Sequence, residues 1–233
     1  MTSIWRLPSN APPSEGTAIM ITWDGETDTE EDFRHLERTF KSANLGIRHL
    51  RLKGKGADAV LAQFKRITAM VDGKGNLVVL CYSGHAHVQA ERLLASGYVQ
   101  DKRLLASGQA GGNFDFTDLQ MHARDALKAN VLMIVDCCFA GLDIPPPDYS
   151  NCTPNRNHVV ELLAAGGSRM AVTAGFSQRV SNALNIAGAD LSACRTIKEL
   201  FDVLISSVRG HPTAPGYYRL ECGAQSMLWK HMD

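Results

Sequence analysis

The chain has 233 residues, in which 24 lysines and arginines balance 24 aspartates and glutamates, and 45% of the residues are hydrophobic. These proportions are typical of a folded globular protein and exclude a disordered or fibrous chain. Zero net charge argues against a dedicated nucleic-acid binder. No apolar stretch approaches the ~20 residues that span a bilayer, and the first residues lack a signal-peptide pattern. We therefore expect a cytoplasmic protein with neither nucleic-acid nor membrane partners.

Short apolar runs alternate with helical patterns along the chain. Residues 1–16 are rich in Pro and Ser, end at Gly16, and are predicted to form an extended lead-in to a single domain over residues 17–233. The predicted strands are residues 18–23, 47–52, 77–82, 131–135, 170–173 and 226–229. The predicted helices begin near Thr29 and near residue 60, run from a capping box at residues 117–120 to about residue 128, and cover residues 158–165, 177–187 and 194–208. The same six residues, Arg-Leu-Leu-Ala-Ser-Gly, occur at 92–97 and at 103–108 and predict the two strands of a hairpin.

This alternation predicts an α/β protein with a mostly parallel sheet of about six strands and helices on both faces. In such sheets, ligands collect beyond the carboxyl ends of the strands. The strand at residues 77–82 is followed by Ser83-Gly84-His85, and the strand at residues 131–135 is followed by Asp136-Cys137-Cys138. One strand thus delivers a histidine and the other a cysteine to the edge where function is expected.

The six cysteines show neither the paired spacing of a zinc site nor the density of a disulfide scaffold. Reduced thiols are the better interpretation, and Cys137 is expected to be a core residue that points away from Cys138. The six are Cys81, Cys137, Cys138, Cys152, Cys194 and Cys222.

The motif Tyr82-Ser83-Gly84-His85, and Asp136-Cys137-Cys138 some fifty residues later, resemble the motifs of the caspase and metacaspase clan of cysteine peptidases. The order of the elements also agrees, and the resemblance covers about residues 17–230. Residues 114–120, 136–141 and 160–165 are similar to caspase-like domains of fungal proteins. The resemblance implies a caspase-like three-layer sandwich and a cysteine endopeptidase, with a role in regulated cell death or immunity.

Carried over to this sequence, the family's catalytic dyad is His85 and Cys138, and its oxyanion donors are the backbone N–H groups of Cys138 and Ala86. A thiolate, a base and such donors are what peptide hydrolysis by cysteine needs. Two positions depart from the family. Ala86 replaces the usual glycine after the histidine, and Phe139-Ala140 replaces the metacaspase His-Ser after the cysteine.

The resemblance also implies a substrate pocket. In metacaspases and paracaspases, an aspartate two residues before the nucleophile helps to bind Arg or Lys at P1; here it is Asp136, with Ser83 lining the same pocket and Asp24 as a further contributor. A buried carboxylate without a cation is costly, which favours a substrate guanidinium or ammonium. The expected partner is a protein substrate with a basic P1 residue; an activating partner or a dimer is left open.

Several alternatives stay open. No cofactor is required, but metacaspases often bind calcium, and four aspartates fall at comparable places, although two of them also suit a helix start: Asp101, Asp115, Asp118 and Asp143. Arg156 is either a self-cleavage site or part of an uncut loop. A metal-dependent hydrolase would use His85, His87 and Cys138. The chief rival is an inactive caspase-like module that serves as an interaction or dimerisation scaffold.

Overall fold

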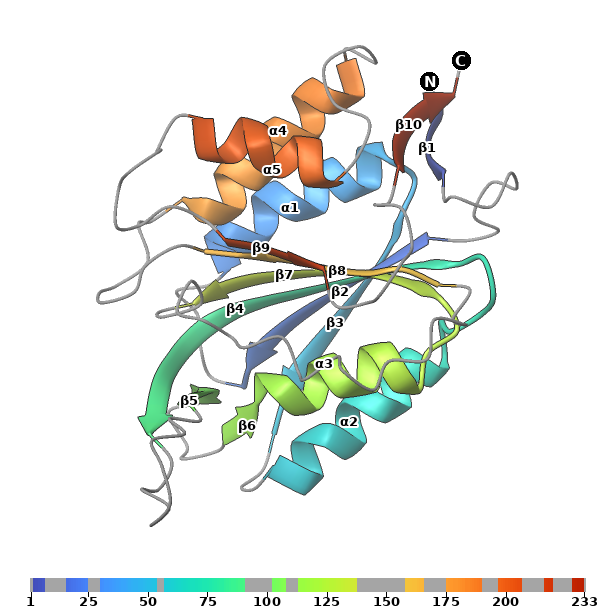
Figure 1. The fold of residues 1–233 in the computed structure, drawn as a ribbon. Coiled ribbons are helices and arrows are strands. Elements are labelled where there is room, and N and C mark those ends of the chain that lie inside the picture. Colours follow the sequence, from blue (N-terminus) through green and yellow to red (C-terminus); the bar gives the residue numbers. More distant parts are fainter. Residues whose placement is uncertain are drawn as a thin grey trace.

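A computed structural model of the chain describes residues 2–6, 16–24, 30–53, 57–90, 102–107, 113–137, 158–165, 175–189, 197–206, 216–219 and 228–232 (Figure 1). The helices are α1 (Glu30–Ser42), α2 (Ala57–Ala69), α3 (Phe116–Asp125), α4 (Phe176–Ala189) and α5 (Ile197–Ser206). The strands are β1 (Thr2–Arg6), β2 (Gly16–Trp23), β3 (Gly46–Leu52), β4 (Leu77–Ala90), β5 (Lys102–Ser107), β6 (Asn113–Asp115), β7 (Asn130–Cys137), β8 (Val160–Ala164), β9 (Gly216–Arg219) and β10 (Leu228–Met232).

The core of the fold is a sheet whose strands lie in the order β3-β2-β4-β7-β8-β9. All its neighbours are parallel except β8 and β9, which are antiparallel. The central strand β7 is buried along its whole length, as is expected for a parallel strand covered on both faces. The predicted sheet of about six mostly parallel strands is confirmed.

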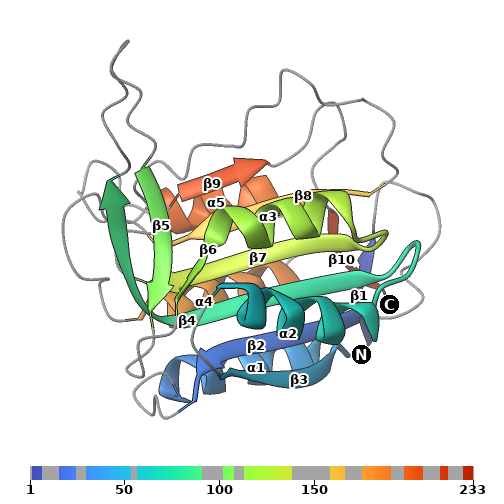
Figure 2. The same cartoon turned by 90° about the horizontal axis from the view of Figure 1, so that it is seen from below.

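Helices cover both faces of this sheet. Figures 1 and 2 show α1, α4 and α5 on one face and α2 and α3 on the other. On the face of α2 and α3, the ring of Phe114 packs against four other aromatic rings, with centroid separations from 5.0 to 6.2 Å. Those rings belong to Trp23, Phe64, Tyr82 and Phe116. Offset and edge-to-face contacts of this kind are the favourable arrangement for aromatic side chains.

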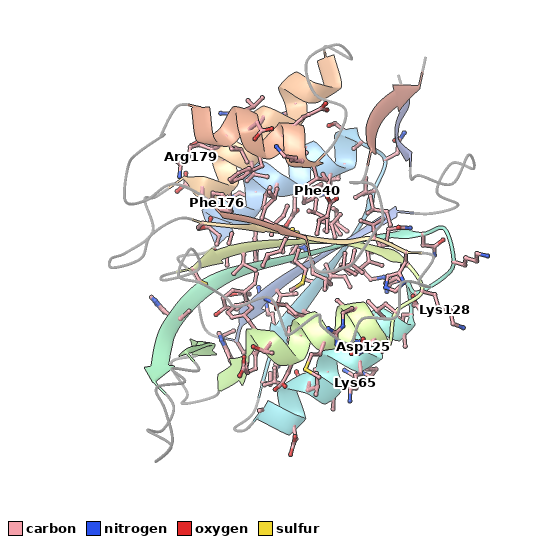
Figure 3. The ribbon with its side chains drawn as sticks, viewed as in Figure 1. Phe40, Lys65, Asp125, Lys128, Phe176 and Arg179 are labelled. Atoms are coloured by element: carbon pink, nitrogen blue, oxygen red, sulfur yellow. The ribbon has the colours of Figure 1, made fainter. Side chains whose placement is uncertain are left out.

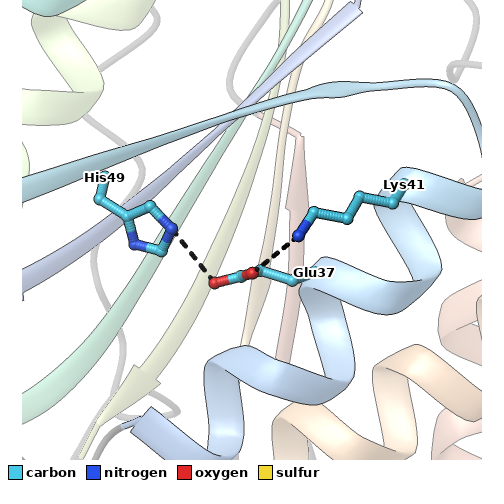
Figure 4. A network of polar contacts seen from close by, with 3 residues as sticks. All are labelled: Glu37, Lys41 and His49. Atoms are coloured by element: carbon cyan, nitrogen blue, oxygen red, sulfur yellow. Dashed lines mark hydrogen bonds and ion pairs between the residues drawn. The ribbon is translucent and has the colours of Figure 1, made fainter.

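A polar contact at the surface links helix α1 to the edge strand β3, and a second one lies within the helix. Figure 4 shows the Glu37 carboxylate between the Lys41 ammonium, 3.4 Å away, and the His49 ring, 3.2 Å away. All three side chains retain access to solvent, so these pairs add little to stability. Buried apolar side chains such as Phe33, Leu36 and Phe40 hold α1 to the sheet.

The prediction of a helix at residues 158–165 is wrong, because this segment contains strand β8. Its residues pair in parallel with β7, from Val131 opposite Val160 to Val135 opposite Ala164. Every residue of β8 is buried. A short apolar run fits a helix or a buried strand equally well, and the ladder to β7 decides between them.

Other predicted elements have different partners or boundaries. The closing strand β10 pairs with β1 in a separate two-stranded sheet (Figure 1). Strand β5 pairs with residues 85–90 of β4 rather than with residues 92–97, which lie outside the described residues, as do residues 170–173. Helix α3 is capped by Asp115, whose carboxylate accepts from Thr117 N at 2.8 Å, instead of by Thr117. Within the described part of the chain, no helix has the length and apolar character needed to cross a membrane.

Candidate active site

The predicted site residues lie where strands β4 and β7 end their shared ladder. In the parallel register, Ser83 is opposite Asp136 and Gly84 is opposite Cys137. The next residues along the two chains are His85 and Cys138. Cys138 lies outside the described residues, whereas His85 is described and its side chain is exposed.

The register also assigns faces, because side chains alternate along a strand and laterally paired residues share a face. Tyr82 packs against Phe114 and Phe116 on the face of α2 and α3. Ser83 therefore points to the opposite face, and Asp136 points there with it. The alternation gives Cys137 the face of Tyr82, and its side chain is buried as predicted.

At His85, strand β4 leaves the main sheet. From this residue onwards it pairs with β5 in antiparallel fashion, with His85 opposite Ser107 and Ala86 opposite Ala106 (Figure 1). The Tyr82 hydroxyl donates to the His85 carbonyl oxygen over 2.8 Å. This bond ties the backbone of His85 to the buried aromatic cluster while its side chain stays at the surface.

The Asp136 carboxylate is buried and engaged by helix α4. Its Oδ2 accepts from the backbone N–H of Ser177 at 3.0 Å and from the Ser177 hydroxyl at 2.6 Å. Figure 3 places Phe176 and Arg179 at the start of α4, near the end of the sheet where β7 finishes and β4 bends away from it. An anion at this position also benefits from the positive end of the helix dipole.

Helix α4 needs this outside acceptor because Gly175 precedes it. The Gly175 carbonyl accepts from Arg179 N at 2.9 Å, which makes Gly175 the N-cap residue. With a φ of +96° it occupies a conformation that suits glycine, and it has no side chain to cap the helix. Asp136 takes over the capping from strand β7. The carboxylate is thus already compensated by two donors, so the cost of burial alone does not require a substrate cation.

The other two predicted pocket residues differ in exposure. Ser83 is buried beside Asp136 in the ladder. Asp24 follows β2, the other neighbour of β4, and its carboxylate lies 3.5 Å from the Lys53 ammonium in an exposed ion pair.

The candidate metal ligands are only partly described. Asp115 is buried as the cap of α3, and Asp118 is exposed in the first turn of that helix. Among the residues that the structure describes, no group of three or more His, Cys, Asp or Glu side chains is arranged to hold a metal ion. Outside them lie Asp101, Asp143, Arg156, Cys138, Cys152 and the side chain of His87.

Sequence reasoning missed Ser177. It stands 41 residues after Asp136, and no motif linked the two. The glycine immediately before a helical pattern was the available signal, because a helix that starts after glycine needs a capping acceptor from elsewhere.

The fold as a whole is similar to those of solved structures. No family model and no curated protein sequence matches the chain. Among solved structures, the chain is similar to caspase-1 of Spodoptera frugiperda, with a TM-score of 0.54 and 14% identity over 94% of this chain and 95% of that one. It is also similar to protein GSU0716 of Geobacter sulfurreducens, with a TM-score of 0.65 and 12% identity over 93% of this chain and 97% of that one. The chain therefore has a caspase-like α/β fold.

Proposed function

We propose that this protein is a cysteine endopeptidase of the caspase and metacaspase type. The observation that carries the proposal is the ladder between β4 and β7. Because Gly84 is opposite Cys137, His85 and Cys138 are the residues that follow on two adjacent central strands. Neighbouring strands are about 4.8 Å apart, which is a distance that an imidazole and a thiol can bridge.

In this proposal, the Cys138 thiolate attacks the scissile carbonyl carbon, after His85 has accepted the thiol proton. His85 returns the proton to the leaving amine, and water then hydrolyses the thioester. The backbone N–H groups of Cys138 and Ala86 stabilise the oxyanion. The similarity to caspase-1 supports this reading at the level of the fold.

The proposed substrate carries Arg or Lys at P1, bound by Asp136 with Ser83 beside it. Both residues are buried on the same face of the sheet end. The Asp136 carboxylate also accepts from the N–H and the hydroxyl of Ser177, which hold it at the end of β7. A cytoplasmic role in cell death or immunity belongs to the same proposal by analogy with the family.

An inactive scaffold is the second candidate, and the position of Ala86 favours it. This residue lies inside the β4–β5 ladder, opposite Ala106. In an antiparallel ladder every second residue directs its N–H to the partner strand. If the Ala86 N–H is directed to β5, it is lost to the oxyanion and catalysis is weak.

The test uses purified full-length protein and fluorogenic peptides with Arg, Lys or Asp at P1, assayed with calcium and with a chelator. The wild type should cleave the Arg and Lys peptides. Both Cys138→Ala and His85→Ala should lower kcat/KM by about a thousandfold or more, because the members of a catalytic dyad act as a unit.

Cys137→Ala is the matched control, because it removes a buried thiol from the adjacent residue. It should leave most of the activity. A folded wild type that cleaves none of the peptides would establish the scaffold instead. Cleavage by Cys138→Ala would show that the nucleophile is another residue, and a preference for Asp at P1 would refute the role of Asp136.

A further inference from the structure

Strand β3 forms one edge of the central sheet, and every second residue of it directs its backbone groups away from the sheet (Figure 2). In a parallel ladder, the residues between these direct both their N–H and their C=O to the neighbouring strand. The Leu52 carbonyl accepts from Asp24 N at 3.0 Å, so Leu52 and every second residue before it face β2. The N–H and C=O groups of Ile47, His49 and Arg51 therefore face outward.

The next outward-facing residue, Lys53, shows how such backbone groups can be paired. Its N–H donates to Oε1 of Gln63 at 3.2 Å, and its carbonyl accepts from Nε2 of Gln63 at 2.7 Å. The Gln63 amide thus pairs with Lys53 as the backbone of another strand would. At Ile47, His49 and Arg51, the same groups have no hydrogen-bond partner among the described residues. Within the described structure, this stretch of the edge is open to a further strand.

The open edge carries an excess of positive charge. Arg48 and Arg51 are exposed, and neither forms an ion pair with a described residue. The carboxylates of Asp24 and Glu37 beside this strand already have basic partners. Pairing β3 with β3 of a second copy would bring like charges together, which is unfavourable. An acidic chain is the complementary partner.

The two arginines lie on opposite faces of the sheet. The His49 ring contacts Glu37 of α1, so Arg51, two residues later, points to the side of α1. By the same alternation, Arg48 points to the side of α2. A strand added beside β3 has the same alternation, so acidic residues at positions i and i+3 would place one carboxylate beside each arginine.

We propose that the outer edge of β3 is a docking site for an extended acidic segment of a partner protein, which adds to the central sheet as a further strand. The backbones of Ile47, His49 and Arg51 supply the ladder, and Arg48 and Arg51 select acidic residues three positions apart. Strand addition of this kind combines main-chain bonds for affinity with side-chain contacts for specificity. The site does not depend on the proposed peptidase activity.

The experiment measures the fluorescence anisotropy of labelled synthetic peptides mixed with the purified full-length protein. The probe is a peptide of threonine and valine with two glutamates three positions apart. A second peptide of the same composition has the glutamates two positions apart, which places both on one face. Two further versions of the probe carry N-methyl groups on alternate residues, in opposite phases, so that only one version loses the N–H groups that would face β3.

The double variant Arg48→Glu, Arg51→Glu should weaken binding of the probe by about tenfold or more, because attraction becomes repulsion on both faces. The matched control is the double variant Lys74→Glu, Lys128→Glu, which makes the same change in net charge at exposed turns before β4 and β7. It should change the affinity by less than about twofold, because those turns are not part of the edge. Thermal unfolding of each variant confirms that it is folded.

The wild type should bind the probe better than the second peptide, and it should bind only one of the two N-methylated versions. Equal affinity for both spacings, equal effects of the two N-methyl phases, or an equal loss in the lysine control would overturn the inference, because each indicates attraction by net charge alone. A wild type that does not bind the probe would overturn it as well. Self-association of the wild type that the arginine substitutions abolish would assign the edge to a second copy instead.

Discussion

The two ends of the central sheet carry similar polar side chains but use them differently. At the amino end, Asp72 Oδ1 accepts from the backbone N–H groups of Lys128 and Ala129 at 2.7 and 2.9 Å, and Asn130 Oδ1 accepts from Val159 N at 2.8 Å. These bonds join the turns that precede β4, β7 and β8. At the carboxyl end, Asp136 binds Ser177 in the same manner, but the neighbouring His85 has an exposed side chain.

The two aspartates show that the same kind of hydrogen bond to the backbone can occur in a purely structural place and in a candidate site. Asp72 accepts from two backbone N–H groups in the turn that precedes β7. Asp136 makes the same kind of bond to the start of a helix. It is also paired with Ser83 in the ladder and lies two residues before Cys138 in the sequence. Its structural bonds therefore do not argue against a role in the site; they hold the carboxylate in one place.

The largest effect should come from removing the two aspartates one at a time. Asp136→Ala leaves two buried donors of Ser177 without their acceptor and should lower the free energy of unfolding by about 2–3 kcal/mol. Asp72→Ala should cost about 1–2 kcal/mol, because its site is nearer to solvent. Chemical denaturation measures both. Cleavage after Arg should fall only in Asp136→Ala; an equal loss in Asp72→Ala would mean that activity merely follows stability.

A smaller effect of opposite sign is expected inside α3. Gln120 is 1% exposed, and neither of its amide atoms has a hydrogen-bond partner among the described residues. Gln120→Leu removes these unsatisfied groups at similar volume and should raise the free energy of unfolding by about 1 kcal/mol. Asn130→Leu, in which the lost amide has partners, is the contrasting variant and should destabilise the protein. A loss of stability in Gln120→Leu would show that the amide is bonded in solution.

The amino end of the sheet should also respond to pH through His122, whose ring lies 2.9 Å from the Thr68 hydroxyl. Burial lowers the pKa of His122 and nearby Lys65 lowers it further, while Asp72 opposes them. The unfolded chain therefore binds a proton first as the pH falls below about 6.5, so stability present above that pH is lost below it. Denaturation midpoints between pH 7.5 and 5 should fall less steeply in His122→Gln, and an unchanged slope would contradict this.

The smallest effect is expected at the surface pair of α1 and β3. Glu37→Gln weakens the exposed contacts to Lys41 and His49 and should change the free energy of unfolding by less than about 0.5 kcal/mol. That difference should disappear in high salt, as measured by denaturation with and without added sodium chloride. A larger change that persists in salt would mean that Glu37 helps to hold the helix by more than charge.

The central strands were predictable because their short apolar sequences fit few structures other than a buried strand. The apolar run that opens β4 and the run in β7 are too short for a buried helix and are bounded by turn residues. Strand β8 was not predictable, because Glu161 interrupts its apolar residues in a way that also suits a helix. In the structure Glu161 is fully buried, and the ladder to β7 overrides the local pattern.

The sequence predicted where the candidate site lies in the sheet, but it did not predict the hydrogen bonds that the site residues make. The strand-end rule brought His85 and Asp136 to one edge, and the ladder register agrees with that expectation. The bond from Ser177 to Asp136 depends on how α4 returns to the sheet, which no local pattern encodes. Likewise, burial raises the pKa of the Cys81 thiol far above its usual range, so this cysteine should be inert; the sequence alone did not separate it from the others.

The pairing of β1 with β10 governs how the molecule would respond to mechanical load. The two strands are antiparallel, and Thr2 lies opposite Met232 at the end of the ladder where both termini emerge (Figure 1). A force that separates these two residues acts across the ladder and opens its pairs one after another, from Thr2 towards Arg6. Such unzipping resists far less than shearing all pairs at once. When the protein is pulled through Thr2 and Met232, the two strands of this small sheet should therefore separate before the central sheet bears tension.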